Sequence, residues 1–219
     1  MPELNGFAIG DFVRREIGLP FLMENDAQAA ALGEVWKGGI AGATNAVVLT
    51  LGTGVGSGVI LEGRLWRGGH FTGPELGHVF LGPGRSRACG CGQVGCIETW
   101  LNKWAFERLA SRCGLSQTQP RHVAQLWEQG DPAATACVRR YGHRIGLAIS
   151  TLQVVFGAEA IGLSGGLSTF FQACEPYVWR TLRHRFTNRQ WWLPATIAAS
   201  PDPDMSGLWG MAKAWLDNG

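Results

Sequence analysis

The chain has 219 residues, of which 46% are apolar and 16% charged, as in an ordinary globular protein. Its formal net charge is +2, and the sequence has neither the basic run typical of nucleic-acid binding nor an acidic tail. Its apolar stretches fall short of the ~20 residues that cross a bilayer, and its first residues lack the features of a signal peptide. We therefore expect a cytoplasmic protein that binds neither nucleic acid nor a membrane.

The first third of the chain predicts helices and a β-hairpin. Asn25 or Asp26 can cap a helix whose alanine run ends at Gly38-Gly39. An apolar, β-branched run followed by glycines favours two strands joined by a loop. In chain order, the expected elements are a helix at 10–18, a short strand at 21–24, the capped helix, a strand at 45–51, a glycine loop at 52–58 and a strand at 59–66.

The rest of the chain predicts a long loop followed by helices and strands. Residues 63–96 are rich in glycine and predict irregular structure. The alternation that follows indicates an α/β fold, and the Gly/Ala-rich segment 38–43 predicts a domain boundary. The later expected elements are helices at 99–113, 120–130 and 131–156, a strand from 159 that runs into a turn at Gly165-Gly166, a helix at about 170–185, a strand at 195–200 and a helix near 205–216.

Three of the six cysteines lie together in the sequence ACGCGQVGCIE, residues 88–98. Cys89, Cys91 and Cys96, with His78 upstream, supply the thiolate and imidazole ligands of a tetrahedral zinc site, and the glycines permit tight turns between them. A redox pair would more usually have the spacing Cys-x-x-Cys before a helix, and three unused thiols would not need this glycine pattern. We therefore predict Zn²⁺ in a structural role, because four protein ligands leave no position open for water.

The segment LTLGTGVGSGVI, residues 49–60, places a glycine loop between two apolar runs. Backbone N–H groups in such a loop can approach an anion closely because no Cβ intervenes, and Thr53 adds a hydroxyl. The segment lacks the Lys-Ser/Thr end of a P-loop, and a strand follows it where a dinucleotide fingerprint needs a helix. Hairpins also need glycine, so the residues leave a phosphate site and a plain turn as alternatives.

Three carboxylates stand near these motifs. Asp26 opens a helix, where it can serve as an N-cap, as a general base that orients a hydroxyl, or as both. Glu75 and His78 share a face if their segment is helical, and Glu98 follows the cysteines. A zinc ion that binds one ring nitrogen of His78 would leave the other for a ligand hydroxyl. Several acceptors on a rigid frame suit a polyhydroxylated ligand, of which sugars are the obvious class.

Taken together, these motifs resemble those of the ROK family of sugar kinases, repressors and open reading frames. Four motifs occur in the same order as in the family and are separated by similar intervals. They are ENDAQAAALGE, LGTGVGSGVI, GPELGH and CGCGQVGCIE. IGLSGGLS resembles the family's glycine turn on the adenosine side, and DMSGLWGMAKAWL resembles its closing helix. The resemblance extends over essentially the whole chain.

The resemblance implies an α/β fold of the actin/hexokinase type (ribonuclease H-like), an ATPase fold with two lobes around a cleft. It implies a complete second lobe at 43–203, with the zinc site and the nucleotide loops, and a partial first lobe formed by 1–42 and the closing helix at about 204–219. The family's kinases begin with a strand that carries Asp-x-Gly-Gly-Thr, and this sequence has no such motif. We therefore expect an N-terminally truncated kinase whose partial lobe exposes apolar surface.

The activity implied by the resemblance is ATP-dependent phosphorylation of a hexose at its 6-hydroxyl, with Mg²⁺ carried on ATP and glucose as the first substrate. N-acetylglucosamine and N-acetylmannosamine are alternative substrates, and family members are often dimers, which allows a homodimer. Carried over by position, Asp26 is the catalytic base. The other implied residues are Asn25, Asp26, Glu75, His78 and Glu98 for the sugar, His78, Cys89, Cys91 and Cys96 for zinc, Gly52, Thr53, Gly54, Val55, Gly56 and Gly58 for the ATP phosphates, and Gly165 and Gly166 for the adenosine side.

Two other interpretations stay open at the level of sequence. A sugar-sensing transcriptional regulator of the same family would reuse the sugar site and add an N-terminal helix-turn-helix, and the sequence contains neither that segment nor a basic patch. The other interpretation is an inactive truncated chain that binds zinc and sugar without catalysis, because the Asp-x-Gly-Gly-Thr motif is missing.

Overall fold

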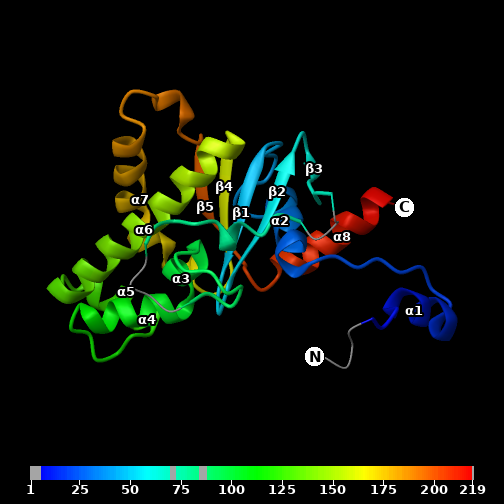
Figure 1. Cartoon of the computed structure of the whole chain (residues 1–219), viewed down its shortest axis with the longest axis horizontal. Coiled ribbons are helices and arrows are strands. Elements are labelled where there is room, and N and C mark those ends of the chain that lie inside the picture. Colours follow the sequence, from blue (N-terminus) through cyan, green and yellow to red (C-terminus); the bar gives the residue numbers. More distant parts are fainter. Residues whose placement is uncertain (1–5, 70–72, 84–87, 219) are drawn as a thin grey trace.

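The computed structural model describes residues 6–69, 73–83 and 88–218, and a five-stranded sheet lies at its centre (Figure 1). The sheet has the order β3-β2-β1-β4-β5 and consists of β1 (Ala46–Leu51), β2 (Val55–Leu61), β3 (Arg64–Leu65), β4 (Ala160–Ser164) and β5 (Thr196–Ala199). β1, β2 and β3 pair antiparallel, whereas β4 lies parallel to β1 and β5 parallel to β4. β1 and β4 are parallel neighbours, and a parallel pair needs a crossover connection. The chain between β3 and β4 therefore passes over one face of the sheet, and it carries helices.

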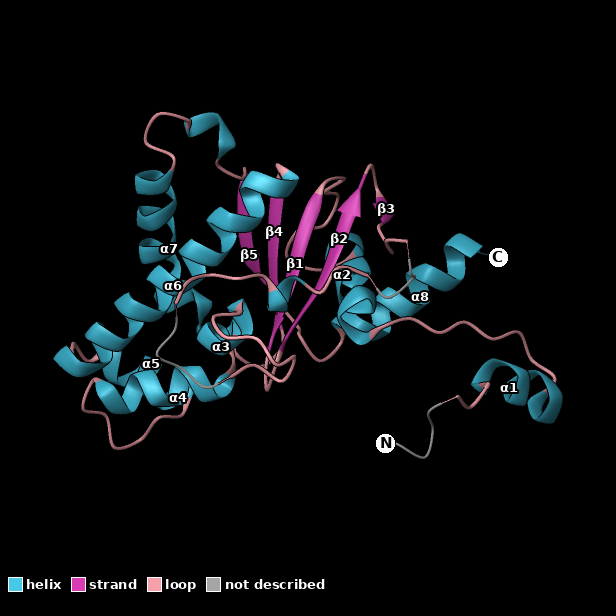
Figure 2. Ribbon diagram, viewed as in Figure 1, coloured by secondary structure: helices cyan, strands magenta, loops and turns pink. Residues whose placement is uncertain are grey.

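Helices cover both faces of this sheet (Figures 1 and 2). On one face lie α2 (Asp26–Trp36) and α8 (Ser206–Asn218). The other face carries the crossover helices and the next helix in the chain, namely α3 (Ile97–Leu101), α4 (Lys103–Arg112), α5 (Pro120–Glu128), α6 (Pro132–Phe156) and α7 (Phe171–Arg185). The connections include the 3-10 turns η2 (Leu76–His78), η3 (Ser168–Phe170) and η4 (Gln190–Trp192). In the described part of the chain, no helix is both long enough and apolar enough to span a membrane.

The apolar run of β1 is continuous because both faces of the strand are buried. Successive side chains point to opposite faces of the sheet. Val47 and Leu49 enter the core formed with α3 and α6, whereas Ala46 and Val48 enter the core formed with α2 and α8. Each of the four is at most 1% exposed. This arrangement confirms the expected α/β class.

Helices α2 and α8 approach so closely that their contact requires glycine. A Cβ built on Gly210 would lie 1.6 Å from the carbonyl oxygen of Ala29, and one built on Gly33 would lie 1.9 Å from that of Ser206. Glu34, which is 1% exposed, adds a polar tie because its carboxylate accepts a hydrogen bond from the Ser206 hydroxyl at 2.5 Å. These contacts fix α2 in position on the sheet.

Replacing Gly210 by Ala should destabilise the protein by about 1–3 kcal/mol or more, because overpacking forces the two backbones apart. Gly207→Ala on the same helix is the matched control, since a Cβ there meets no atom within 4 Å. Exchange of glycine for alanine at that position should be neutral or should stabilise by about 0.5–1 kcal/mol. Thermal unfolding measures the difference, at roughly 2–4 °C per kcal/mol for a chain of this size. Equal melting temperatures in the two variants would contradict the close contact.

The hairpin turn is shorter than expected. β2 begins at Val55, inside the expected glycine loop, so the turn between β1 and β2 is confined to 52–54. Glycine fits in this strand because α2 packs closely against it. A Cβ on Gly58 would lie 2.4 Å from the Cβ of Ala31. The expected loop at 52–58 was therefore wrong over its second half.

Three other elements differ from their expected form. The expected strand at 59–66 is interrupted because Glu62-Gly63 adopts left-handed φ angles of 52° and 75° and turns the chain into β3. The expected single helix at 99–113 is two helices, because Asn102 ends α3 and its side chain caps α4. Residues 21–24 form no strand in the described chain, because no neighbouring strand pairs with them.

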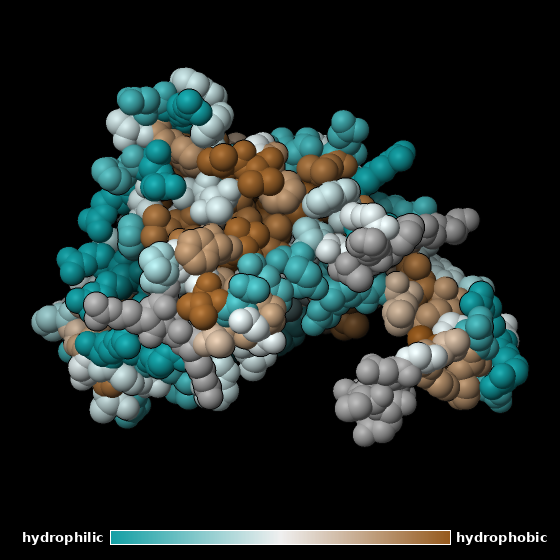
Figure 3. Space-filling model, in the orientation of Figure 1, coloured by the Kyte–Doolittle hydropathy of each residue, from teal (hydrophilic) through white to brown (hydrophobic). Residues whose placement is uncertain are grey.

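Helix α1 (Ile9–Ile17) stands apart from the sheet and its covering helices (Figure 1), and none of its residues is buried. Apolar side chains gather on this helix (Figure 3), and the exposed ones on and beside it are Phe7, Ile9, Phe12, Ile17 and Leu19. The division of the chain into lobes at residues 42 and 43 stays a prediction. Helix α2, which falls in the first of these two parts, packs directly on the sheet.

Candidate functional site

A cavity of about 470 Å³ lies where the N-terminus of α2 and the turn between β1 and β2 meet the segment that leads into α3. Its described lining includes three carboxylates and neither Lys nor Arg, and we call it the acidic cavity. A lining rich in acceptor oxygens suits a neutral ligand with many O–H groups. The structure brings together in this lining all five residues predicted to bind a polyhydroxylated ligand: Asn25, Asp26, Glu75, His78 and Glu98.

The N-terminus of α2 presents Asp26 to the acidic cavity without using it as the cap. The Asn25 side chain caps the helix, accepting the N–H of Ala27 at 3.0 Å and that of Gln28 at 3.3 Å. One carboxylate oxygen of Asp26 accepts the Ala27 N–H at 2.7 Å, and the residue is exposed. The sequence left either Asn25 or Asp26 as the N-cap of this helix. The cap is Asn25, and Asp26 is accessible to a ligand.

A buried serine holds the loop that carries Glu75 and His78. The loop contains η2, and both side chains line the acidic cavity. The hydroxyl of Ser57, a residue that is 6% exposed, donates to the carbonyl oxygen of Pro74 and accepts the Leu76 N–H at 3.0 Å. Because Ser57 lies on β2, these bonds fix the loop to the sheet. Ser57 could not be predicted from the sequence, since a serine inside a glycine-rich segment carries no signal of its own.

Glu98 enters the acidic cavity from α3 with both carboxylate oxygens held. One oxygen accepts the backbone N–H of Val55 at 3.1 Å, and the other accepts the Cys89 thiol at 3.3 Å. The first contact requires a glycine beside it, because a Cβ on Gly54 would lie 2.8 Å from the carboxylate. The turn between β1 and β2 therefore positions Glu98.

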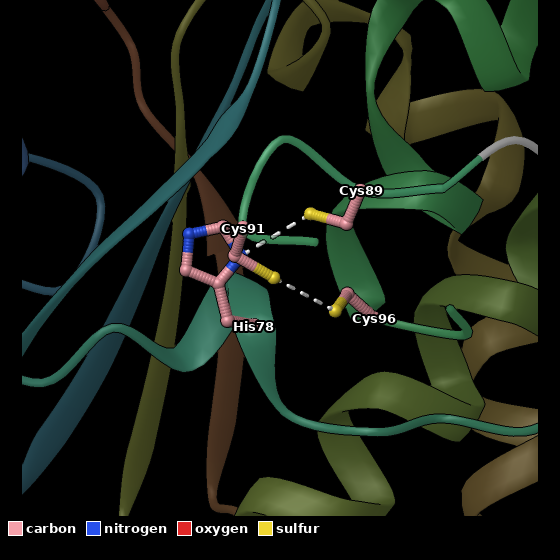
Figure 4. A group of neighbouring side chains, drawn as sticks. All are labelled: His78, Cys89, Cys91 and Cys96. Atoms are coloured by element: carbon pink, nitrogen blue, oxygen red, sulfur yellow. Dashed lines mark hydrogen bonds between the residues drawn. The ribbon is translucent and has the colours of Figure 1, made fainter. Parts of the chain in front are cut away.

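The ligand atoms of His78, Cys89, Cys91 and Cys96 all lie within 4.8 Å of one another (Figure 4). The Cys91 and Cys96 sulfurs are 3.7 Å apart, and the Cys89 sulfur is 3.4 Å from Nδ1 of His78. In a tetrahedron with Zn–S bonds of about 2.3 Å and Zn–N bonds of about 2.0 Å, two sulfurs are about 3.8 Å apart and a nitrogen is about 3.5 Å from a sulfur. The donor set therefore suits a four-coordinate Zn²⁺, and these two distances match its geometry.

Two backbone contacts bring these ligands together from separate segments. An isolated antiparallel bridge pairs Phe80 with Cys96, so the segment after His78 lies beside the segment that leads into α3. A tight turn follows Cys89, whose carbonyl oxygen accepts the Gly92 N–H at 2.9 Å. Gly92 has a left-handed φ of 88°, which glycine adopts at no steric cost.

The three thiols of the cluster differ in acidity. Burial raises the pKa of the Cys89 thiol to about 12 and also raises the pKa of Cys96. A hydrogen bond from the backbone N–H of Gln93 lowers the pKa of the exposed Cys91. Thiolates are the form that binds metal, so Zn²⁺ at this site would displace the thiol protons.

A second cavity, of about 680 Å³, shares Gly52 and Thr53 with the acidic cavity. The turn after β4 borders both cavities, with Gly165 in the lining of the first and Gly166 in the lining of the second. We call the second one the cationic cavity. Its charged and amide-bearing lining residues are Lys103, Gln119, Arg121 and Asp204.

Of the residues predicted for the ATP phosphates, Gly52 and Thr53 line both cavities, whereas Gly54, Val55 and Gly56 line the acidic cavity alone. Gly58 is not part of either lining, because it lies beneath α2. Gly165 has a left-handed φ of 79°, and a Cβ there would lie 2.7 Å from the carbonyl oxygen of Leu51. Lys103 and Arg121 were not predicted to line a cavity, because neither stands in a motif.

Comparison with known proteins agrees with these observations. A family model described as ROK family matches residues 2–218. A glucokinase of Halalkalibacterium halodurans is 32% identical over 177 residues, and an N-acetyl-D-glucosamine kinase of Salmonella paratyphi B is 32% identical over 171 residues. Both alignments cover 74% of this chain, and they cover 53% and 56% of the respective relatives. The chain therefore spans about half the length of these curated relatives.

A solved structure shares the fold. It is a ROK family glucokinase from Streptomyces griseus in complex with glucose and AMPPNP, and the superposition has a TM-score of 0.81 at 28% identity. The match covers 96% of this chain and 72% of that chain. The likeness confirms the expected fold class, an α/β fold of the actin/hexokinase type.

Proposed function

The chain belongs to the ROK family, and we propose that it transfers the terminal phosphoryl group of ATP to the 6-hydroxyl of a hexose, with glucose as the first candidate. The main support for the proposal is that Asp26, Glu75, His78 and Glu98 line one and the same cavity. This cavity shares Gly52-Thr53 with a second cavity whose volume is in the usual range for small-molecule sites. A sugar and a nucleotide can therefore occupy neighbouring cavities.

The acidic cavity suits a hexose because its acceptors are held in place before the ligand arrives. Glu98 is fixed by the Val55 N–H, and the loop that carries Glu75 is fixed by Ser57. Sugar hydroxyls donate to carboxylate oxygens. Groups already held in the binding geometry lose little conformational entropy when the ligand binds.

Asp26 accepts a hydrogen bond from the 6-hydroxyl and aligns that oxygen with the phosphorus. The positive end of the α2 dipole favours the negative charge of the carboxylate, and the Ala27 N–H orients one of its oxygens. Phosphoryl transfer depends mainly on positioning and on neutralisation of charge, so alignment by Asp26 contributes more than proton removal. Mg²⁺ bound with ATP supplies neutralisation of the phosphate charge.

A structural Zn²⁺ held by His78, Cys89, Cys91 and Cys96 is the second part of the proposal. Through these four residues, a bound ion would tie the η2 loop to the segment before α3. The Nδ1 atom of His78 faces the Cys89 sulfur. If Nδ1 held the metal, the other ring nitrogen of His78 would be left to bind a sugar hydroxyl, and the metal would fix the tautomer.

N-acetylglucosamine is the second candidate substrate, because an N-acetyl-D-glucosamine kinase is among the relatives at 32% identity. The two sugars differ at the 2-position and share the 6-hydroxyl. The carboxylates of the acidic cavity accept hydroxyls in either case. The ratio of the two kcat/KM values therefore decides between the candidates.

A coupled assay for ADP with glucose, N-acetylglucosamine and N-acetylmannosamine tests the proposal. We expect ADP formation that depends on glucose and a product phosphorylated at the 6-hydroxyl. The matched control is 6-deoxyglucose, which lacks only the accepting hydroxyl and should compete with glucose without supporting ADP formation. A higher kcat/KM for N-acetylglucosamine would assign the second candidate. If no hexose stimulated ADP formation, the proposed activity would be wrong.

A further inference from the structure

We infer that Lys103 and Arg121 bind the phosphate groups of the nucleotide in the cationic cavity. The inference rests on the proposed function, which places ATP beside the sugar. It goes beyond that function by naming the charged side chains that hold the donor. Neither residue belongs to a glycine motif or to the cysteine cluster.

The two cavities differ in charge over the residues that the structure describes. Asp26, Glu75 and Glu98 line the acidic cavity without a Lys or Arg beside them, so a triphosphate is repelled there. The cationic cavity has Lys103 and Arg121 with a single carboxylate in its described lining. A polyanion is therefore directed to the cationic cavity and a neutral polyol to the acidic one.

Lys103 is anchored to the turn that both cavities share. It is the first residue of α4, and its backbone N–H donates to the carbonyl oxygen of Gly52 at 2.8 Å. Its ammonium group lies 3.9 Å from the Glu107 carboxylate, and the Lys103 side chain is 44% exposed. An exposed ion pair with so long a distance between its charged atoms contributes little to the stability of the protein. The weak pair with Glu107, which does not line the cationic cavity, can therefore open and let the ammonium group turn towards a phosphate there.

Arg121 lies at the start of α5, which has nine residues. Pro120 begins this helix, and Gln119 before it makes no capping hydrogen bond through its side chain. All three residues line the cationic cavity, so the uncapped end of the helix borders the same cavity as Arg121. Helix N-termini favour anions, and a guanidinium can bind phosphate oxygens in a bidentate manner.

No ion pair within the described chain occupies the Arg121 side chain. Thr53 lines both cavities, so under the proposed function a phosphoryl group would pass from donor to acceptor beside it. The two cations lie on the donor side of that border. Their loss should therefore weaken binding of ATP and leave binding of glucose intact.

Isothermal titration calorimetry of the full chain with Mg-ATP, with adenosine and with glucose tests the inference. Lys103→Gln and Arg121→Gln should each weaken ATP binding about tenfold, the usual loss for a charge-assisted hydrogen bond. Binding of adenosine and glucose should change little, because neither ligand carries a phosphate. Lys103→Arg keeps the charge and should retain most of the ATP affinity, whereas Arg121→Lys keeps the charge without the bidentate contact and should retain only part of it.

Arg185→Gln is the matched control for net charge. Arg185 ends α7, is exposed and lines neither cavity, so its loss should leave ATP binding unchanged. Wild-type affinity for ATP in both of the variants Lys103→Gln and Arg121→Gln would overturn the inference and leave the proposed function standing. An equal loss of adenosine binding would overturn it too, because the residues would then shape the cavity without meeting phosphate. ATP binding that depends on both cations, in a chain without hexose-dependent turnover, would support the inference and contradict the proposed function.

Discussion

The Asp26→Asn variant should phosphorylate glucose about 10²–10⁴-fold more slowly than the wild-type chain, the range in which a positioned acid–base group contributes. The amide keeps the size of the side chain and can still accept the Ala27 N–H. It loses the negative charge that attracts the hydroxyl proton, so the sugar binds without being aligned. We therefore expect the loss in kcat from the coupled assay, with a glucose dissociation constant close to that of the wild type.

Asp11→Asn is the control for loss of one carboxylate. Asp11 lies on the exposed helix α1 and lines neither cavity, so its replacement should leave kcat unchanged. The melting temperatures of both variants should match that of the wild type, because neither carboxylate is buried. An Asp26→Asn enzyme that retained wild-type kcat would show that another group aligns the hydroxyl.

The Cys91→Ser variant should lose zinc and much of its thermal stability. A ligand present at about 1,000 times its dissociation constant stabilises the native state by about 4 kcal/mol. At roughly 2–4 °C per kcal/mol, its loss should lower the melting temperature by about 8–16 °C. Cys91 is exposed and serine is nearly its size, so the substitution itself should cost little. Elemental analysis should find one zinc per wild-type chain and none in the variant.

A strong chelator separates metal loss from other effects of this substitution. The wild-type chain and Cys91→Ser should melt at the same temperature once the metal is removed. Cys113→Ser is the matched control, because Cys113 lies at the end of α4, outside the cluster, and its loss should leave the zinc content unchanged. A wild-type chain without zinc, or a variant that kept it, would disprove the metal site.

Sequence patterns predicted the elements whose burial follows a regular period. The helix expected at 131–156 is α6, and the strand expected at 45–51 is β1, each within one residue. The sequence patterns gave wrong predictions where the local structure depends on a contact with another segment or side chain. Residues 21–24 have the composition of a strand and lack a strand to pair with, and the break at Asn102 depends on whether its side chain turns back to cap α4.

The candidate site was predictable to the extent that its residues stand in short motifs. Cys89, Cys91 and Cys96 are close in sequence, so their convergence on one point needed only tight turns. Lys103 and Ser57 were not predictable, because their positions depend on contacts between distant segments. Ser57, for example, meets the Leu76 N–H across 19 residues.

The imidazole of His78 stands between two ligand positions. The residue lines the acidic cavity, and its Nδ1 atom faces the Cys89 sulfur. When two ligands share one group, each changes the binding affinity of the other by the same factor. If the metal raises the affinity for the sugar, the sugar therefore raises the affinity for the metal equally. In a cell rich in hexose, this protein would then hold its ion against competing chelators with higher affinity than in a starved one.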